Sequence, residues 1–441
     1  MKKIFFCFLL FSVTAKAQES KPYEMDIKGV KVVVVPSGNE IVQIDMVIKG
    51  GLQNYTADKA GIEKLAMTAL TECGTMKRDK NAFKNELDAV EAYMNCFTGR
   101  DAARAQLNCI KMDFETVWPL YVEALTMPKF DAKEFARIKE EALNHVREEE
   151  SNPDAALQKM AMQTAFKGKD YAKSTNGSIE SIQKLTPAAT KAYLQSILTR
   201  SRIFIVVVGD ISKDDLEKKM TALIDKIPQG KPFTIKRSTY TPQANTFVPQ
   251  QKDVATNYIM GISSAPAADS KEHMAGALAS AMFYDKAFLE VRTNNGLSYA
   301  PAAGISNGLT PYSYLYVTTK EPDKYIAVAR NMVDKLKKEG FPQDDVRNKK
   351  NTFTTQQYYR NETNGSLAAL VANAELLRGD WKKAFTLKED LKPITTSDIN
   401  QVFNKYIGSF TWVYQGDPKQ VNQTLFTQKE TPPLLEKKKA F

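Results

Sequence analysis

Residues 60–75, AGIEKLAMTALTECGT, are the stretch that decides how this chain folds. Six apolar residues in it recur at the spacing of a helix with one buried face: Ile62, Leu65, Ala66, Ala69, Leu70 and Cys73. The segment Cys73-Gly74-Thr75 supplies the turn at which such a helix ends. The pattern therefore predicts one amphipathic helix whose apolar side faces a core.

Strand patterns lie on both sides of this helix. Residues 32–35 and 41–48 are rich in β-branched side chains and flank Pro36-Ser37-Gly38-Asn39, and the second run alternates apolar with polar residues. We expect a hairpin with one buried face here. Residues 95–109 predict another strand pair. Residues 132–150 predict a long helix that ends at Ser151-Asn152-Pro153.

Two segments far apart in the chain share one order of features. Thr186 opens a predicted helix, an apolar strand follows at residues 203–208, and Gly209-Asp210 ends the unit. Thr395 opens a second such unit, which ends at Gly416-Asp417, and the spacings from threonine to aspartate are 24 and 22 residues. A strand that is apolar on both faces lies inside a sheet covered by helices. The order of features predicts two related α/β halves.

The clearest boundary lies between these halves. Residues 228–252 are polar and contain four prolines that interrupt regular structure: Pro228, Pro232, Pro242 and Pro249. A chain of 441 residues is also too long for one ordinary core. We expect a signal peptide at residues 1–17, an N-terminal domain at 18–227, a linker at 228–252 and a C-terminal domain at 253–441.

The first 20 residues, MKKIFFCFLLFSVTAKAQES, have the composition of a secretory signal. Two lysines precede an apolar run over residues 4–13, and Ala15-Lys16-Ala17 forms an A-x-A cleavage site. The run is too short to span a membrane. We therefore expect an exported, periplasmic protein without a transmembrane segment. Its three remaining cysteines, Cys73, Cys96 and Cys109, favour buried free thiols over a single disulfide.

Composition excludes several classes of function. The chain is 43% hydrophobic and 25% charged, as in a soluble globular protein, and its formal net charge of +10 is modest for the length. It has no basic patch interleaved with aromatic residues, so we expect no nucleic-acid partner. Its only histidines are His145 and His273, which rules out a zinc site made of two histidines one helical turn apart.

The AGI…GT frame of residues 60–75 resembles the zinc-site helix of the insulinase-like peptidases (pitrilysin family, inverzincins). Those enzymes carry H-x-x-E-H here, with two zinc-binding histidines and a glutamate that activates water. In this chain the matching positions are Lys64, Met67 and Thr68. An alignment shifted by one residue gives Leu65, Thr68 and Ala69 instead. Neither alignment supplies a zinc ligand.

The resemblance also implies a third ligand, a glutamate on the long helix eight residues before an Asn-Pro or Asp-Pro end. Counting back from Pro153 gives His145, which we interpret as an ordinary helix residue. We therefore expect no metal and no other cofactor in this chain. It should bind no zinc tightly and hydrolyse no peptide by itself.

One further segment resembles the family: LEVRTNNGLSYAPAAGISNG, residues 289–308. Arg292, Gly296, Leu297 and Tyr299 match an Arg-x6-Tyr motif whose arginine and tyrosine, in the family, reach a zinc site across a chamber to bind substrate. A tyrosine hydroxyl can donate to a developing oxyanion, and a guanidinium can hold peptide carbonyls with fixed geometry. The alternative is that Arg292 is a helix-end cation and Tyr299 a packed aromatic residue.

The resemblance implies an α+β fold of two homologous domains, each an antiparallel sheet with helices on one side, forming a clamshell around a chamber. It also implies a function. We expect a non-catalytic, substrate-binding subunit that supplies Arg292 and Tyr299 in trans to the zinc site of an H-x-x-E-H partner, acting on unstructured peptides. Two alternatives stay open: a stand-alone pseudo-peptidase that binds peptides or serves as an envelope scaffold, and, against the missing ligands, a self-sufficient peptidase.

Overall fold

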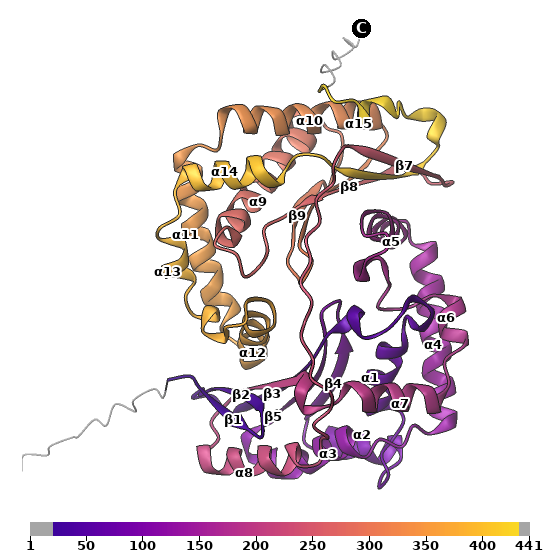
Figure 1. Cartoon of the computed structure of the whole chain (residues 1–441), viewed down its shortest axis with the longest axis vertical. Coiled ribbons are helices and arrows are strands. Elements are labelled where there is room, and N and C mark those ends of the chain that lie inside the picture. Colours follow the sequence, from indigo (N-terminus) through magenta and orange to yellow (C-terminus); the bar gives the residue numbers. More distant parts are fainter. Residues whose placement is uncertain (1–20, 432–441) are drawn as a thin grey trace, which may run out of the picture.

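A computed structural model of the chain describes residues 21–431, so the expected signal peptide at residues 1–17 lies outside the described residues. The described part consists of two β-sheets and the helices that cover them, one sheet in each half of the sequence (Figure 1). The predicted α+β class with two sheet-and-helix halves is confirmed.

The first sheet has the strand order β1-β2-β6-β3-β5-β4. Its strands are β1 (Tyr23–Ile27), β2 (Val30–Val35), β3 (Ile41–Lys49), β4 (Tyr93–Thr98), β5 (Ala102–Ile110) and β6 (Ile203–Val208). The expected hairpin of β2 and β3 is wrong, because β6 lies between them, parallel to β2 and antiparallel to β3. All six residues of β6 are buried, which explains why this apolar strand takes the central place.

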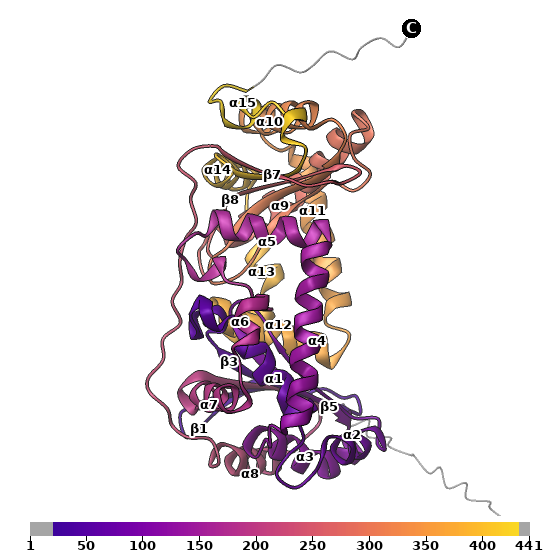
Figure 2. The ribbon, with the colours of Figure 1, turned by 90° about the vertical axis from the view of Figure 1, so that its right-hand side faces the viewer.

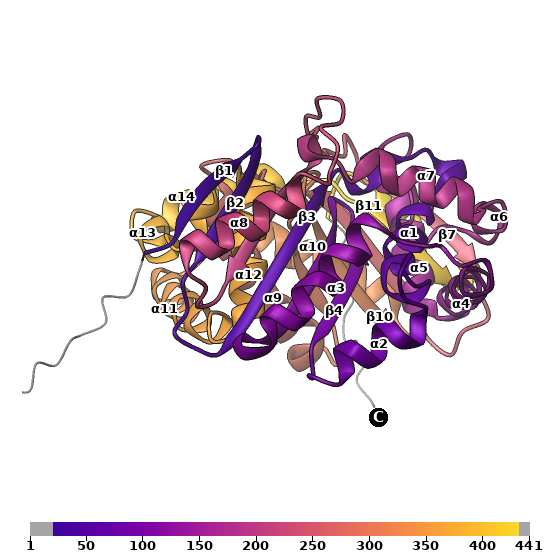
Figure 3. The same ribbon diagram turned by 90° about the horizontal axis from the view of Figure 1, so that it is seen from below.

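The described first half contains eight α-helices, most of them on one face of this sheet, whereas the one at Pro153–Ala165 packs on the second sheet. They are α1 (Ile62–Glu72), α2 (Lys80–Asp88), α3 (Phe114–Thr126), α4 (Ala132–Ser151), α5 (Pro153–Ala165), α6 (Ile179–Gln183), α7 (Pro187–Ile197) and α8 (Lys213–Ile224). Seen from below, α3 and α8 lie in front of the strands (Figure 3). The long helix α4 ends where the sequence predicts, with Asn152 capping the next helix through its side chain.

The second sheet has the order β7-β11-β8-β10-β9. Its strands are β7 (Thr246–Gln251), β8 (Asn257–Ser264), β9 (Ala302–Ser306), β10 (Tyr312–Thr319) and β11 (Thr411–Gly416). The helices of this half include α9 (His273–Ala287), its π-helical extension η6 (Phe288–Asn294), α10 (Pro322–Glu339), α11 (Gln343–Arg360), α12 (Asn364–Asn373), α13 (Leu387–Leu391), α14 (Thr396–Tyr406) and α15 (Thr424–Thr427).

The two halves repeat one topology. The order β2-β6-β3-β5-β4 corresponds strand for strand to β7-β11-β8-β10-β9, and each sheet contains one parallel pair, β2 with β6 and β7 with β11. The sheets are therefore mixed rather than purely antiparallel as expected. The helices α7 and α14 also correspond, since Thr186 and Thr395 each cap their helix through the side-chain oxygen.

Each half covers the second face of the other half's sheet. Helix α12 packs across β3 and β6 of the first sheet, and α5 packs across β8 and β11 of the second (Figure 1). In consequence both faces of β3 are buried, where the sequence predicted one. The predicted arrangement, with helices on a single side of each sheet, is correct for each half taken alone. In the whole molecule, a helix of the other half covers the second side of each sheet.

The two crossings differ in polarity. Under α12, the Arg104 guanidinium pairs with the buried carboxylate of Asp45 at 2.8 Å and donates to the Asn373 side chain of α12 at 2.6 Å. Burial raises the pKa of Asp45, and Arg104 opposes this shift. At the α5 crossing, the Tyr316 hydroxyl of β10 donates to the Asp154 carboxylate.

The predicted linker is extended over most of its length and runs along one side of the molecule between α8 and β7 (Figure 2). It is fixed rather than loose: Gln53 exchanges two hydrogen bonds with Lys236, at 2.7 and 2.9 Å. Its last part differs from the prediction, since residues 246–251 form the edge strand β7. Pro249 is tolerated there because an edge strand can turn its missing N–H away from the ladder.

The three cysteines of the described chain are free. Cys73 and Cys109 are buried, and Cys96 is half-buried on β4. Burial raises the pKa of each thiol to about 12, so these groups stay protonated at neutral pH.

Candidate functional site

Helix α1 brings Lys64 next to the long helix α4. The Lys64 ammonium donates to the Asn176 side-chain oxygen at 2.7 Å, and the Asn176 amide donates in turn to the Glu149 carboxylate of α4. Nε2 of His145 lies 3.5 Å from that same carboxylate oxygen. One polar cluster therefore joins Lys64 and His145 of the sequence prediction with Asn176 and Glu149, which the sequence did not indicate.

The other positions of the two alignments lie elsewhere on α1. Met67 is fully buried and Thr68 is half-buried, whereas Leu65 and Ala69 are packed in the first hydrophobic core. The alignment that begins at Lys64 thus places its first residue beside α4. The shifted alignment places its first and last residues in the core.

These side chains do not fit a zinc ion. Zinc is bound in proteins by imidazole, thiolate and carboxylate groups, three of them in a catalytic site. Lys64 is an ammonium that only donates hydrogen bonds, and its pKa is lowered by burial while Glu149 opposes the shift. Among residues 21–431, no group of three or more His, Cys, Asp or Glu side chains is arranged to hold a metal. We therefore derive no zinc chemistry from this chain.

Glu63, the neighbour of Lys64, is the most enclosed carboxyl group of α1. Its Oε2 accepts hydrogen bonds from the Tyr193 hydroxyl at 2.6 Å and from the Asn54 amide at 3.0 Å, while its Oε1 has no partner in the described structure. Burial raises the pKa of Glu63, and the two hydrogen bonds and Arg202 oppose the rise. Glu63 ties α1 to α7 and has no access to solvent.

A small polar cavity of about 200 Å³ adjoins the Lys64 cluster. Arg100, Glu149, Lys159, Tyr171, Lys173 and Asn176 are among the residues that line it. Tyr171 and Asp101 connect it to the second half: the Tyr171 hydroxyl donates to Asp101 at 2.7 Å, and the Leu309 amide donates to the same carboxylate at 3.2 Å. The cavity therefore lies where the two halves meet.

Arg292 and Tyr299 lie together at the end of the other predicted element. Arg292 is on η6, and its guanidinium carbon is 4.2 Å from the centre of the Tyr299 ring and 4.8 Å from that of Phe288. This geometry is that of a cation held between two aromatic faces. Tyr299 is 80% exposed, and its hydroxyl has no hydrogen-bond partner within the described part of the chain. The alternative of a packed aromatic residue does not fit this exposure.

Hydrogen bonds of the backbone fix the turn between these two residues. The Gly296 amide donates to the Arg292 carbonyl at 3.1 Å, and the Leu297 amide donates to the Val291 carbonyl at 2.9 Å. Gly296 has a φ of +61°, a left-handed conformation that favours glycine. The turn thus holds Tyr299 outward on a fixed base. Gly304, the next glycine along the chain, is not part of this turn, because it lies in strand β9 against the Tyr314 ring.

The structure does not join the two sets of residues. Within residues 21–431, no hydrogen bond, ion pair or ring contact links Arg292 or Tyr299 to Lys64, Thr68 or His145. The Arg292–Tyr299 pair therefore makes its ring contacts within its own half.

Two models of one protein family match the chain. The family model "Insulinase (Peptidase family M16)" matches residues 31–178, and the model "Peptidase M16 inactive domain" matches residues 184–353. The chain belongs to the insulinase family, M16. Its sequence contains no H-x-x-E-H, since its only histidines are His145 and His273.

Its relatives within M16 include proteins described as inactive. "Non-peptidase homolog YmxG" of Helicobacter pylori is 22% identical over 416 residues, which cover 91% of this chain and 94% of that protein. A crystal structure of a peptidase M16 inactive domain from Pseudomonas fluorescens superposes with a TM-score of 0.82 at 18% identity, over 90% of this chain and 97% of that one. The periplasmic protease PqqL of Escherichia coli gives a TM-score of 0.78 at 14% identity, over 94% of this chain and 49% of PqqL.

Proposed function

We propose that this M16 chain is the non-catalytic, substrate-binding subunit of an exported zinc peptidase. It supplies Arg292 and Tyr299 to the zinc site of a separate chain that carries H-x-x-E-H. The observation that carries the proposal is the exposed, unpartnered hydroxyl of Tyr299, held beside the Arg292 guanidinium on a turn fixed by backbone hydrogen bonds. In this exposed position the Arg292 guanidinium and the Tyr299 hydroxyl are hydrated, and they lose that water only when a second molecule covers them.

The chemistry of the pair suits a peptide carbonyl. A phenol donates one hydrogen bond to the oxygen as negative charge develops on it, and the effect is strongest where water is excluded. A guanidinium donates from a planar fork, so it fixes the direction of the peptide it binds. The stacked Tyr299 ring restricts Arg292 to one orientation and reduces the entropy lost on binding. Zinc bound to the partner would supply the activated water.

Export is part of the proposal. It rests on the composition of residues 1–17. Within residues 21–431, none of the helices has both the length and the apolar character needed to cross a membrane. Localisation is tested by fractionating cells that express the full chain and determining the N-terminal residue of the protein in the periplasmic fraction. A mature chain beginning near Gln18 supports export, and a full-length cytoplasmic chain contradicts it.

The first test uses the isolated chain. We expect the purified protein to retain no zinc after dialysis and to cleave no unstructured peptide, because its donor set does not fit the ion. Elemental analysis that finds about one zinc per chain would overturn this expectation and favour a self-sufficient peptidase.

The second test uses the complex. The native protein is isolated with its partners, a co-purifying H-x-x-E-H chain is identified, and peptide cleavage is measured after reconstitution. Tyr299→Phe should lower kcat by about 10²–10³, the effect of removing one oxyanion donor. Arg292→Lys should mainly weaken substrate capture, since it keeps the charge and loses the fork. Tyr358→Phe and Arg347→Lys, exposed residues of α11, are the matched controls.

Sedimentation of each variant complex shows whether assembly is intact. Wild-type turnover from both variants in an intact complex would contradict the proposed role. Failure to find any H-x-x-E-H partner, together with binding of peptides by the isolated chain, would instead support a stand-alone pseudo-peptidase.

A further inference from the structure

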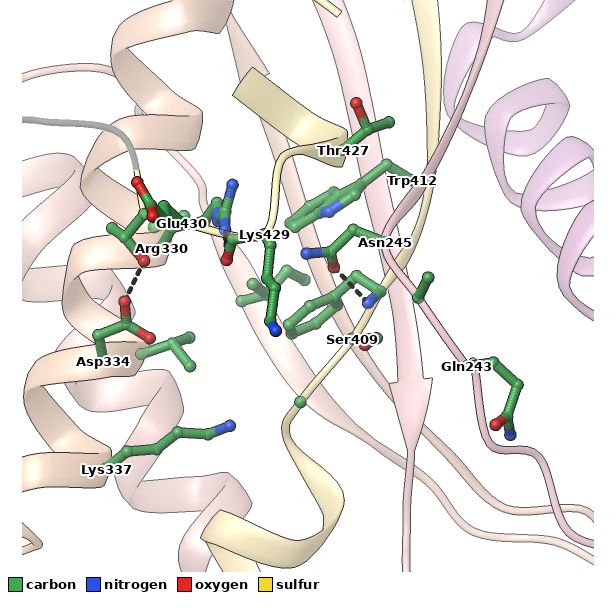
Figure 4. Close-up of a pocket in the computed structure, with 17 residues that line it drawn as sticks. Gln243, Asn245, Arg330, Asp334, Lys337, Ser409, Trp412, Thr427, Lys429 and Glu430 are labelled. Carbon is green, nitrogen blue, oxygen red and sulfur yellow. Dashed lines mark hydrogen bonds between the residues drawn. The ribbon is translucent and has the colours of Figure 1, made fainter. Parts of the chain in front are cut away.

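A second and larger cavity lies in the C-terminal half, away from the Lys64 cluster and the Arg–Tyr pair. Its volume is about 660 Å³, and it opens between α10, the start of β11 and residues 427–431 (Figure 4). All of its lining residues come from positions 243–431, so the first half contributes none. The cavity is therefore a feature of one half and is independent of the proposed peptide site.

The outer wall of this cavity is fixed to α10. The Arg330 guanidinium donates to the backbone carbonyls of Leu425 and Lys429, each at 3.0 Å. The Thr431 hydroxyl donates to the Asp334 carboxylate one helical turn further along α10. These bonds engage both terminal nitrogens of Arg330 and one oxygen of Asp334, and they hold residues 425–431 as one side of the cavity.

Two ammonium groups of the lining have no direct ion pair in the described part of the chain, although Asp334 lies near enough to Lys337 to act on its charge. The side chains of Lys337 and Lys429 both extend into the space between α10 and β11 (Figure 4), and neither has an ion pair or side-chain hydrogen bond within the described residues. Lys337 is half-buried, and this burial lowers its pKa while Asp334 opposes the shift. Besides Asp334, the one carboxylate in the lining is that of the exposed residue Glu430.

The inner wall combines the edges of two largely buried aromatic residues, Phe410 at 5% and Trp412 at 1% exposure, with unused donors. Phe410 and Trp412 stack with ring centres 4.9 Å apart. The indole N–H of Trp412 is buried and has no hydrogen-bond partner in the described structure, a costly arrangement for a donor. The Asn245 oxygen accepts from the Phe410 amide at 2.8 Å, which leaves the Asn245 amide hydrogens unused at the cavity. Leu315 and Val333 complete the apolar part.

We propose that this cavity binds a small organic anion that has one acidic group and an aromatic or branched apolar body. The acidic group lies against Lys337 and Lys429, where an ammonium that has already lost water gains most from a charge-assisted hydrogen bond. The apolar body lies against the part of the lining formed by Leu315, Val333 and the edges of Phe410 and Trp412. Two carboxylates in the lining, Asp334 and Glu430, disfavour a multiply charged ligand such as a nucleotide. The volume suits a ligand of this size.

The test uses 4-phenylbutanoate and its neutral amide as probes of equal shape. Binding to the full chain is measured by calorimetry and by the change in tryptophan fluorescence. We expect the acid to bind about tenfold or more tightly than the amide, the difference that one charge-assisted hydrogen bond supplies. Inorganic phosphate alone should bind far more weakly, since it lacks the apolar body.

Matched variants locate the site. Lys337→Met should weaken binding of the acid about tenfold and leave the amide unchanged. Lys338→Met, an exposed change of the same charge on the same helix, should leave both probes unchanged, and Lys337→Arg should retain most of the affinity. Trp412→Phe keeps an aromatic wall and should remove the fluorescence response.

Equal affinities of the acid and the amide would overturn the proposal. So would a Lys337→Met protein, folded by circular dichroism, that binds the acid as the wild type does. If Lys337→Met fails to fold, Lys429→Met on the exposed segment takes its place. It should also weaken binding of the acid about tenfold, and wild-type affinity for the acid would overturn the proposal. None of these readouts depends on peptide cleavage, so they are independent of the proposed subunit role.

Discussion

Helices α1 and α9 occupy the same place in the two halves and both pair polar side chains within their own half, but the predicted site residues Lys64 and Tyr299 differ in exposure. Each follows the middle strand of its sheet, packs on the edge strand β4 or β9, and contacts the threonine-capped helix α7 or α14. On α1, Glu63 and Lys64 are bonded to groups of their own half. Helix α9 continues into η6, and Tyr299, which lies beyond the end of η6, is 80% exposed.

The difference shows that a repeated fold can enclose a polar group in one half and expose one near the matching place in the other. Polar groups that find partners inside the half lock its helices together, as Lys64 and Glu149 do through Asn176. Polar groups that find none within the half, such as the exposed Tyr299 hydroxyl, are left to water. In this chain the polar groups of α1 in the first half are bonded within that half, whereas the Tyr299 hydroxyl after η6 in the second half is exposed.

The largest expected effect concerns the two interdomain crossings. Arg104→Met leaves the buried Asp45 carboxylate without its counter-ion and should lower the free energy of unfolding by about 3–5 kcal/mol. Tyr316→Phe at the α5 crossing removes one hydrogen bond from a more exposed site and should cost about 1 kcal/mol. Urea unfolding measures both, with the exposed Arg147→Met as control. Equal losses of unfolding free energy from Arg104→Met and Tyr316→Phe would show that the polar contacts at the two crossings stabilise the fold equally.

The next effect compares α1 with η6 directly. Lys64→Met removes the ammonium that bridges α1 to α4 and should cost about 1–2 kcal/mol of unfolding free energy. Tyr299→Phe should change it by less than about 0.5 kcal/mol, because the hydroxyl has no partner. Thermal and urea unfolding test the pair, with exposed Lys59→Met as control. A larger loss of unfolding free energy from Tyr299→Phe than from Lys64→Met would contradict the contrast between the bonded Lys64 and the exposed Tyr299.

The smallest effect is a dependence on pH. Burial holds the pKa of Glu63 above its ordinary value of about 4.3. A carboxyl group of this kind binds its proton more tightly in the folded state, so its contribution is greatest below the unfolded pKa and is lost as pH rises through the folded pKa. Glu63→Gln should therefore flatten the fall in stability above about pH 4.

This pH effect is isolated by a difference between variants, because Asp45 and Asp101 also have raised pKa values. Urea unfolding from pH 4 to pH 8 is compared for the wild type, Glu63→Gln and the exposed control Glu217→Gln. Parallel curves for the wild type and Glu63→Gln would show that the Glu63 pKa is not raised in the folded protein.

Local patterns predicted the elements well but not their partners. The helix at residues 60–75, the strand pair at 95–109 and the long helix at 132–150 all form close to the predicted bounds. The hairpin of β2 and β3 was wrong because β6, more than 150 residues later, enters between them. Periodicity within one segment carries no information on such insertions.

The candidate site shows the same limit. The loss of H-x-x-E-H and the Arg292–Tyr299 spacing are visible in the sequence, because they depend on residue types at fixed offsets. The bond from Lys64 to Asn176 joins residues 112 positions apart, and no local pattern marks that asparagine. The cavity beside Lys337 is equally invisible, because it is formed where α10, β11 and the C-terminal segment converge.

The exchange of α5 and α12 has a consequence for smaller proteins of this architecture. A chain made of residues 18–227 alone would leave Val33, Val206 and Val208 uncovered, since these residues pack on Val371 and Ala372 of α12. An isolated half would therefore expose a broad apolar sheet face to water. It could bury that face by pairing with a second copy, each lending its own helix α5 to the other's sheet. The full-length chain thus has the architecture of a two-fold dimer of half-length chains joined end to end.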